Sequence, residues 1–143
     1  MIPPKQYVLL LLLATAICLP KPLPAQTNTD TEAQQHFQLA HQAQAAGQLD
    51  TAAAEYQKVI RLKPEVAEGY ASLGLVYYAQ SKFADSARVL EQAYKLNPRL
   101  PGVSLVLGLD SIKLYHPARA IPYLRQAISL EPANKQAQSS LGT

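Results

Sequence analysis

The sequence is poor in the residues that build disulfide, metal and cofactor sites. It contains one cysteine in 143 residues, three histidines and no tryptophan. A single cysteine forms no disulfide within the chain. His36 and His41 lie five residues apart, about 140° around a helix, so they do not converge on one metal ion. The sequence also has no Gly-rich phosphate loop and no His-Glu-x-x-His or Gly-x-Ser-x-Gly motif. We therefore expect no catalysis, no cofactor and no metal.

The N-terminal stretch predicts an export signal. Lys5 precedes an apolar run at residues 7–19 that only Thr15 interrupts, and a proline-rich segment follows and ends at Ala25. A positive start, an apolar core and a small residue at the end are typical of a cleaved signal peptide. The predicted divisions of the chain are a signal peptide at 1–25, a flexible polar linker at 26–32 and a repeat domain at 33–143.

Export would place the mature chain in a periplasm or outside the cell, with no membrane contact after the signal is removed. Two alternatives stay open. In one, Cys18 carries a lipid anchor, although the preceding Ile17 is bulkier than such signals favour. In the other, the signal stays uncleaved and anchors the chain. The apolar run would rise about 20 Å as a helix, which is short of a hydrocarbon core of about 30 Å.

The basic excess of the chain is small once the signal is removed. The whole sequence carries 13 basic and 10 acidic residues and a net charge of +3. Cleavage would remove Lys5 and Lys21 and leave a net charge of +1. Such a balance gives no electrostatic reason to expect a nucleic acid as partner.

A period of about 34 residues runs through the rest of the chain. The prolines Pro64, Pro98 and Pro132 follow it, as do the pairs Leu73-Gly74, Leu107-Gly108 and Leu141-Gly142 and the apolar residues Tyr56, Leu90 and Leu124. Within each unit the apolar residues fall three and four apart, which indicates helices. A break near Ser81 divides the middle unit into two helices. Two helices in a period of this length indicate an all-α helical solenoid.

The pattern resembles the tetratricopeptide repeat family. The resemblance covers three units and the start of a fourth, at 33–66, 67–100, 101–134 and 135–143. The middle unit carries the family pattern at Tyr70, Leu73, Gly74, Tyr77, Leu90, Ala93 and Pro98. The first unit has His36 and Ala43 at the two aromatic places, and the third has Ser104 and Ser111, which we expect to weaken packing locally. The resemblance implies a right-handed superhelical solenoid of helix-turn-helix repeats.

Small residues at one place of each unit predict close approach of two helices. Ala40, Gly74 and Gly108 share this register. Glycine inside a helix costs about 1 kcal/mol relative to alanine, so its recurrence requires a packing reason. We expect the large residues Tyr56, Leu90 and Leu124 to fill the space opposite.

The resemblance also implies a binding surface. In the family, the first helices of successive units line a concave groove that holds an extended peptide or a partner helix. The residues in that register here are Phe37, His41, Glu68, Leu75, Tyr78, Leu105, Leu109, Ile112 and Lys113. Most are apolar, and the Lys, Asn and Arg side chains with which some members clamp a C-terminal carboxylate are missing from the matching places. The alternative is that Leu105 and Ile112 pack against neighbouring repeats.

Two functions follow as hypotheses. The first is an exported, non-enzymatic scaffold that binds a protein or peptide segment in the groove. The second is the N-terminal repeat portion of a longer exported protein whose activity lies beyond residue 143. The fourth unit stops without the polar capping helix usual in the family, so self-association through the uncapped C-terminal end is a further expectation. The reading frame after Thr143 would separate the two hypotheses.

Overall fold

The computed structural model describes residues 28–142, so the predicted signal peptide and its cleavage site lie outside the described residues. Within this range the chain forms seven helices and no strand. They are α2 (Asn28–Ala45), α3 (Leu49–Leu62), α4 (Ala67–Ala79), α5 (Phe83–Leu96), α6 (Val103–Lys113), α7 (Pro117–Leu130) and α8 (Lys135–Leu141). The all-α solenoid predicted from the period is confirmed. None of the helices in the described part of the chain is both long and apolar enough to cross a membrane.

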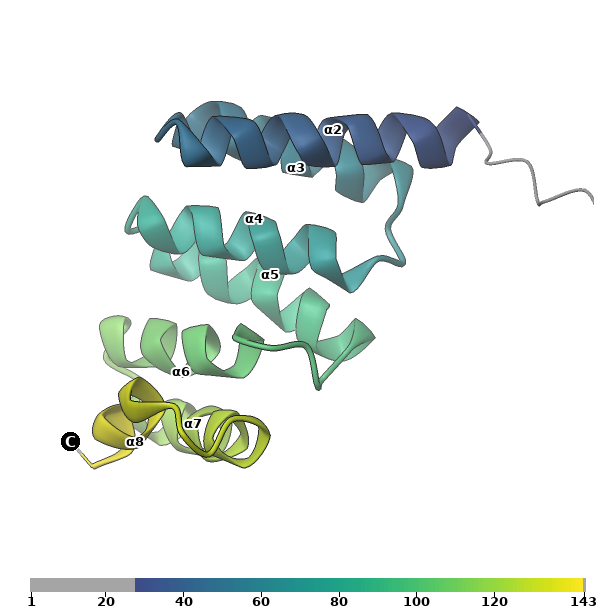
Figure 1. The fold of residues 1–143 in the computed structure, drawn as a ribbon. Coiled ribbons are helices and arrows are strands. Elements are labelled where there is room, and N and C mark those ends of the chain that lie inside the picture. Colours follow the sequence, from purple (N-terminus) through teal and green to yellow (C-terminus); the bar gives the residue numbers. More distant parts are fainter. Residues whose placement is uncertain (1–27, 143) are drawn as a thin grey trace, which may run out of the picture.

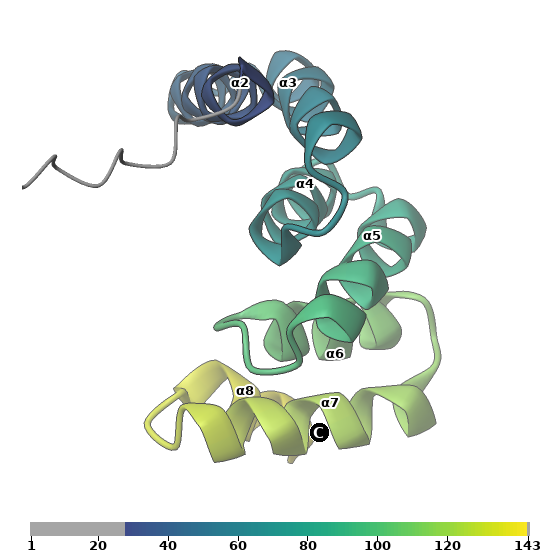
Figure 2. The ribbon, with the colours of Figure 1, turned by 90° about the vertical axis from the view of Figure 1, so that its right-hand side faces the viewer.

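The helices form a stack of antiparallel pairs, one pair per repeat unit. Figure 1 shows α2 with α3, α4 with α5, and α6 with α7 following one another down the stack, with α8 beside α7. In the turned view, α2 and α4 lie along one side and α3 and α5 along the other (Figure 2). The first helices of the second and third units, α4 and α6, also contact each other directly. This contact makes a continuous surface of consecutive first helices.

The first helix begins earlier than expected. The sequence predicts a start near Glu32 and a linker before it, whereas α2 begins at Asn28, so residues 28–32 of the expected linker are helical. Asp30 lies in this added turn and forms an ion pair with Lys63, just after α3. A carboxylate in the first turn is also favourable against the helix dipole. The missed turn therefore carries a contact between residues far apart in the sequence.

The turn inside each unit has one repeated geometry. Gly47, Ser81 and Tyr115 stand at the same place of the period and all have positive φ, of 74°, 59° and 61°. The following amide bonds back across each turn, for example from Lys82 N to Tyr77 O at 2.9 Å and from His116 N to Ser111 O at 2.8 Å. This is the bonding of a helix that ends on a left-handed residue, for which glycine is the usual choice. Two of the three turns therefore hold a residue with a Cβ in a conformation that costs about 1–2 kcal/mol.

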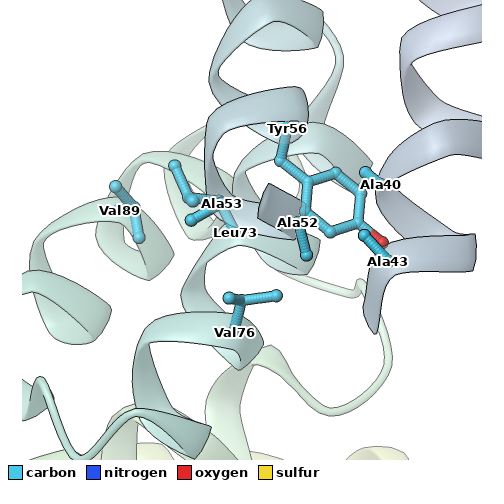
Figure 3. Close-up of a cluster of buried hydrophobic side chains, with 8 residues drawn as sticks. All are labelled: Ala40, Ala43, Ala52, Ala53, Tyr56, Leu73, Val76 and Val89. Atoms are coloured by element: carbon cyan, nitrogen blue, oxygen red, sulfur yellow. The ribbon is translucent and has the colours of Figure 1, made fainter. Parts of the chain in front are cut away.

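The core is built at the places that the period predicts. One cluster contains buried residues from α2, α3, α4 and α5. Its members are Ala40, Ala43, Ala52, Ala53, Tyr56, Leu73, Val76 and Val89 (Figure 3). A Cβ added to Gly74 would lie 2.4 Å from Leu90 Cγ, and one added to Gly108 would lie 2.6 Å from Leu124 Cδ2. Both distances are far inside van der Waals contact. The predicted close approach of the two helices of a unit is confirmed.

The third unit packs differently from the second. Ser104 and Ser111, which replace the aromatic residues of the family pattern, are both buried. The Ser111 hydroxyl donates to Leu107 O at 2.8 Å inside its own helix. Aromatic volume comes instead from Tyr94 and Tyr123, whose ring centroids lie 5.6 Å apart and nearly perpendicular. The packing of Tyr94 against Tyr123, from the neighbouring helices α5 and α7, thus opposes the local weakening expected at the serines.

Candidate functional site

The predicted groove residues of α4 lie on one side of that helix. Leu75 is a large apolar residue inside α4, and its side chain is nevertheless 43% exposed. Tyr78 is half-buried and Glu68 is exposed. Positions 68, 75 and 78 fall within about 80° of one another on a helix with 100° per residue. These residues therefore form a single face, apolar towards the C-terminal end of α4.

The groove residues of α6 extend this face. Leu105 and Leu109 are half-buried, Lys113 is exposed, and Ile112 is 36% exposed. Ile112 also lines a cavity of about 510 Å³ with Ile121 of α7 and Leu141 of α8. The alternative that Leu105 and Ile112 pack against neighbouring repeats therefore stays a prediction. Tyr78 of α4 packs against the core cluster that contains Val103, Val106 and Leu107 of α6, and α4 contacts α6. We call Leu75, Tyr78, Leu105, Leu109 and Ile112 the apolar stripe.

Phe83 joins this surface, and the sequence analysis missed it. Its ring contacts that of Tyr78 edge to face, with 5.5 Å between centroids. Lys113 Nζ lies 6.0 Å from the Phe83 ring centroid, within the range of a cation–π contact. Phe83 is the first residue of α5, and Leu49 begins α3 in the same register. An apolar residue at the start of the second helix in both of these units was therefore the sequence feature that could have indicated Phe83.

The two groove residues of α2 have other contacts. The Phe37 ring lies 5.5 Å from the Tyr56 ring of α3 and 5.1 Å from His41, and it packs against the core cluster of α2 to α5. His41 is exposed, and its ring centroid lies 6.0 Å from that of Tyr56. Both side chains therefore support the pairing of α2 with α3. The part of the predicted groove that the structure assembles is the part on α4 and α6.

The charges near the stripe are few. Glu68 and Lys113 are the charged members of the predicted set, and both are exposed. His36, at the other end of the chain, is held by Glu55, with 2.6 Å between Nδ1 and Oε2, and this contact braces α2 against α3. In residues 28–142 no three His, Cys, Asp or Glu side chains gather closely enough to hold a metal ion. The stripe is thus suited to contact with an apolar surface rather than to chemistry.

Asp110 is a buried acid that the sequence analysis did not single out. It is fully buried in α6, at the place that Val76 occupies in α4. Neither carboxylate oxygen has a hydrogen-bond partner in the described part of the chain. Burial raises the pKa of Asp110 from 3.8 to about 6, and the nearby Ser86 hydroxyl only partly opposes this rise. The residue could have been found from the period, because an acid stands where the preceding unit has valine.

The comparisons with known proteins agree with this architecture. Residues 45–81 match the family described as TPR repeat. The TPR domain of Arabidopsis OM64 superposes with a TM-score of 0.77 at 19% identity, covering 80% of this chain and 94% of that one. No curated protein matches the chain in sequence.

Two further solved structures are TPR domains with a bound peptide. The first TPR of Spaghetti (RPAP3), bound to the HSP90 peptide SRMEEVD, has a TM-score of 0.75 at 20% identity and covers 78% of this chain and 89% of that one. The second TPR domain of human RPAP3, in complex with the HSP70 peptide SGPTIEEVD, has a TM-score of 0.75 at 20% identity and covers 80% and 95%. Residues 28–142 therefore have the fold of a tetratricopeptide repeat solenoid, with three helical hairpins followed by α8, and residues 45–81 match the repeat itself.

Proposed function

We propose that this chain is an exported, non-enzymatic scaffold that binds a segment of a partner protein along the apolar stripe. The observation that carries the proposal is the exposure of Leu75 and Ile112 on two consecutive first helices that contact each other. Large apolar residues that gather on one exposed surface are typical of interaction sites. Burial of one such side chain by a partner is worth about 1.5–3 kcal/mol.

Peptide complexes of proteins with a similar fold support the proposal that the partner binds as a peptide segment. Two of the superposed TPR domains hold short peptides. The ligand of this chain should differ in chemistry, because the stripe is apolar and the clamp residues for a carboxylate are missing from its sequence. We therefore expect a partner segment with apolar anchors, and binding that salt weakens little, since Glu68 and Lys113 are the charges closest to the stripe in sequence register.

Site-directed photo-crosslinking tests the stripe. A photo-reactive residue at Leu75 or Ile112 should form a crosslink to a partner in the native compartment, and the same residue at the exposed Ala54 of α3 should not. The crosslink from Leu75 should be lost when Tyr78 is replaced by alanine and the circular dichroism spectrum is unchanged. Equal crosslinking from all three positions would argue against a specific site. Crosslinks between two copies of the chain would show that the stripe is an assembly surface.

Export is the second part of the proposal. It is supported by Lys5, the apolar run at 7–19 and the small Ala25 after a proline-rich segment. N-terminal sequencing of the protein produced with its own leader should give Gln26 as the first residue. A soluble cytoplasmic product that retains Met1 would contradict export and leave the stripe experiment unaffected.

A further inference from the structure

A second candidate binding site lies on another side of α4. An open cavity of about 310 Å³ is formed where α3, α4 and α5 meet. Its floor consists of the rings of Tyr70 and Tyr77 and the aliphatic side chains of Ile60, Leu73 and Val89. We call this cavity the tyrosine pocket. Its volume is at the lower end of the range for ligand sites, which runs from about 300 to 1,000 Å³, and it suits one side chain better than a large cofactor.

The rim of the tyrosine pocket is positively charged. Arg61 from α3 and Arg88 from α5 line it, and no acidic residue does. Arg61 has no ion-pair or hydrogen-bond partner among residues 28–142. Arg88 contacts Asp85 on its own helix, with 3.3 Å between Nη2 and Oδ1. An exposed pair of this kind is weak, so both guanidinium groups are available to a ligand.

The polar groups inside the tyrosine pocket mainly donate hydrogen bonds. Gln57 Nε2 donates to the Tyr77 hydroxyl at 2.8 Å. The hydrogen of that hydroxyl has no acceptor in the described part of the chain. An arginine has only donors, and it binds carboxylates through a planar fork. A pocket with donors at the rim and an apolar floor is complementary to a carboxylate that stands beside an apolar group.

The next joint of the solenoid carries different side chains at the matching places. There, one period later, Tyr94 and Tyr123 take the places of the two aliphatic floor residues from α3 and α5, and their rings pack against each other. Pro122 stands in the place of Arg88. Arg119 at that joint is paired with Glu91 at 2.8 Å. Lys95 stands in the place of Arg61, so one rim charge recurs. The aliphatic floor and the second arginine are therefore features of the first joint and do not follow from the repeat itself.

From this complementarity we propose that the tyrosine pocket binds an acidic segment of a partner protein, in which an apolar side chain is flanked by Asp or Glu. The apolar side chain lies on the floor between Tyr70 and Tyr77, and the flanking carboxylates pair with Arg61 and Arg88. Two carboxylates on either side of one anchor match two guanidinium groups that come from different helices across the pocket.

This site is independent of the apolar stripe. Tyr70, Leu73 and Tyr77 lie roughly 140–160° around α4 from Leu75, at about 100° per residue. A segment bound in the tyrosine pocket therefore leaves the stripe free. One chain could hold two partners, an acidic one at the pocket and an apolar one at the stripe, and either site can fail in experiment without the other.

Matched peptides test the pocket. The probes are acetylated and amidated heptapeptides with a central Phe flanked by Glu, by Gln or by Lys, together with a Glu-flanked peptide that has a central Ala. Amide chemical shifts of the ¹⁵N-labelled protein, recorded during titration at low salt, report affinity and location together. We expect the Glu-Phe peptide to bind most tightly and to shift residues 57–61, 70–77 and 88–89. Binding should weaken about tenfold when Arg61→Gln and Arg88→Gln are combined, because both ion pairs to the flanking carboxylates are then lost.

The loss of an arginine outside the pocket separates the pocket from general attraction. Arg125→Gln, at an exposed arginine of α7, should leave the affinity unchanged. The combination Arg61→Glu and Arg88→Glu should reverse the preference towards the Lys-flanked peptide. The proposal is wrong if the Gln- and Glu-flanked peptides bind equally, if shifts map to Leu75 and Ile112 instead, or if no peptide binds saturably. Phenylacetate that binds as tightly as the Glu-Phe peptide would show a site for small carboxylates and would also overturn it.

Discussion

Tyr94 and Tyr123 meet edge to face between α5 and α7, with 5.6 Å between their ring centroids. They stand one period after Ile60 and Val89, while Ser104 and Ser111 stand one period after Tyr70 and Tyr77. The aromatic residues therefore stand on α4 in the first joint of the solenoid and on the flanking helices α5 and α7 in the second. The Tyr94 hydroxyl also bonds to Gln126 of α7. This arrangement keeps the second joint filled without the aromatic residues of the family pattern.

A double-mutant cycle tests this arrangement. Ser111→Tyr alone should destabilise the protein by about 1–3 kcal/mol, because it adds a ring to a filled joint. Tyr123→Val alone should also destabilise it, because it removes a ring. The double variant, which restores the arrangement of Tyr77 and Val89, should lose less than the sum by at least about 0.5 kcal/mol in urea unfolding. Additive losses would show that the two positions do not share one space.

Gly74 should not tolerate even a methyl group. Alanine is favoured over glycine in a helix by about 1 kcal/mol, but its Cβ would lie 2.4 Å from Cγ and 2.5 Å from Cδ2 of Leu90. We expect Gly74→Ala to lower the free energy of unfolding by about 1–3 kcal/mol. Gly69→Ala in the same helix is the control, because its Cβ would lie 3.4 Å from the nearest atoms, and this change should be close to neutral. If Gly74→Ala raises stability as propensity alone would predict, the two helices must separate at low cost.

Most of the fold could be predicted from the period of about 34 residues in the sequence. It gave the pairing of Gly74 with Leu90, because both recur with the same spacing and only a helical hairpin brings them together. It did not predict the first turn of α2, which carries the ion pair between Asp30 and Lys63. That contact depends on how the end of α3 lies against the start of α2, which a count of residues does not show.

The candidate sites were predictable to different degrees. Leu75 and Ile112 followed from the family register, but the role of Phe83 required the angle between α4 and α5, which brings its ring to Tyr78. The tyrosine pocket was not predicted, since an open joint depends on the combined volume of residues from three helices. The sequence alone places Asp110 in register with Val76. It does not show that Ser86, on another helix, lies beside this carboxyl group.

Glycine at the strained turns should stabilise the protein. Tyr115 is 91% exposed and has a φ of 61°, so its replacement removes backbone strain and little packing. The left-handed conformation costs a residue with a Cβ about 1–2 kcal/mol, and glycine loses about 0.5–1 kcal/mol of this gain through its more flexible unfolded chain. Tyr115→Gly should therefore raise the free energy of unfolding by about 0.5–1 kcal/mol. Gly47→Ala, where a Cβ would meet no atom within 4 Å, should lower it by a similar amount through φ alone. A loss of stability in Tyr115→Gly would mean that the tyrosine ring makes a contact worth more than the strain.

Asp110 should make the stability of the third unit depend on pH. Its pKa is about 6 in the folded chain against an ordinary value of 3.8, so folding disfavours the ionised form. Below about pH 3 both states are protonated and no penalty arises. As the pH rises from about 3 to 7 the unfolded state ionises first and stability falls, and above about pH 7 the loss is constant at up to about 3 kcal/mol. Glu55 acts in the opposite direction, because its hydrogen bond to Lys58 lowers its pKa in the folded state, so its contribution is lost as the pH falls.

The comparison with Asp110→Asn isolates the effect of this one acid. Asparagine has nearly the same shape and no charge, and every other group is common to both proteins. The difference in free energy of unfolding between variant and wild type should grow in favour of the variant from about pH 3 to about pH 7 and then stay level. Amide exchange at the same pH values should place the change in α5 and α6, which are in contact and which hold Ser86 and Asp110 close together. Parallel profiles for the two proteins would show that Asp110 ionises in the folded state at no cost, and that this joint opens to water without unfolding.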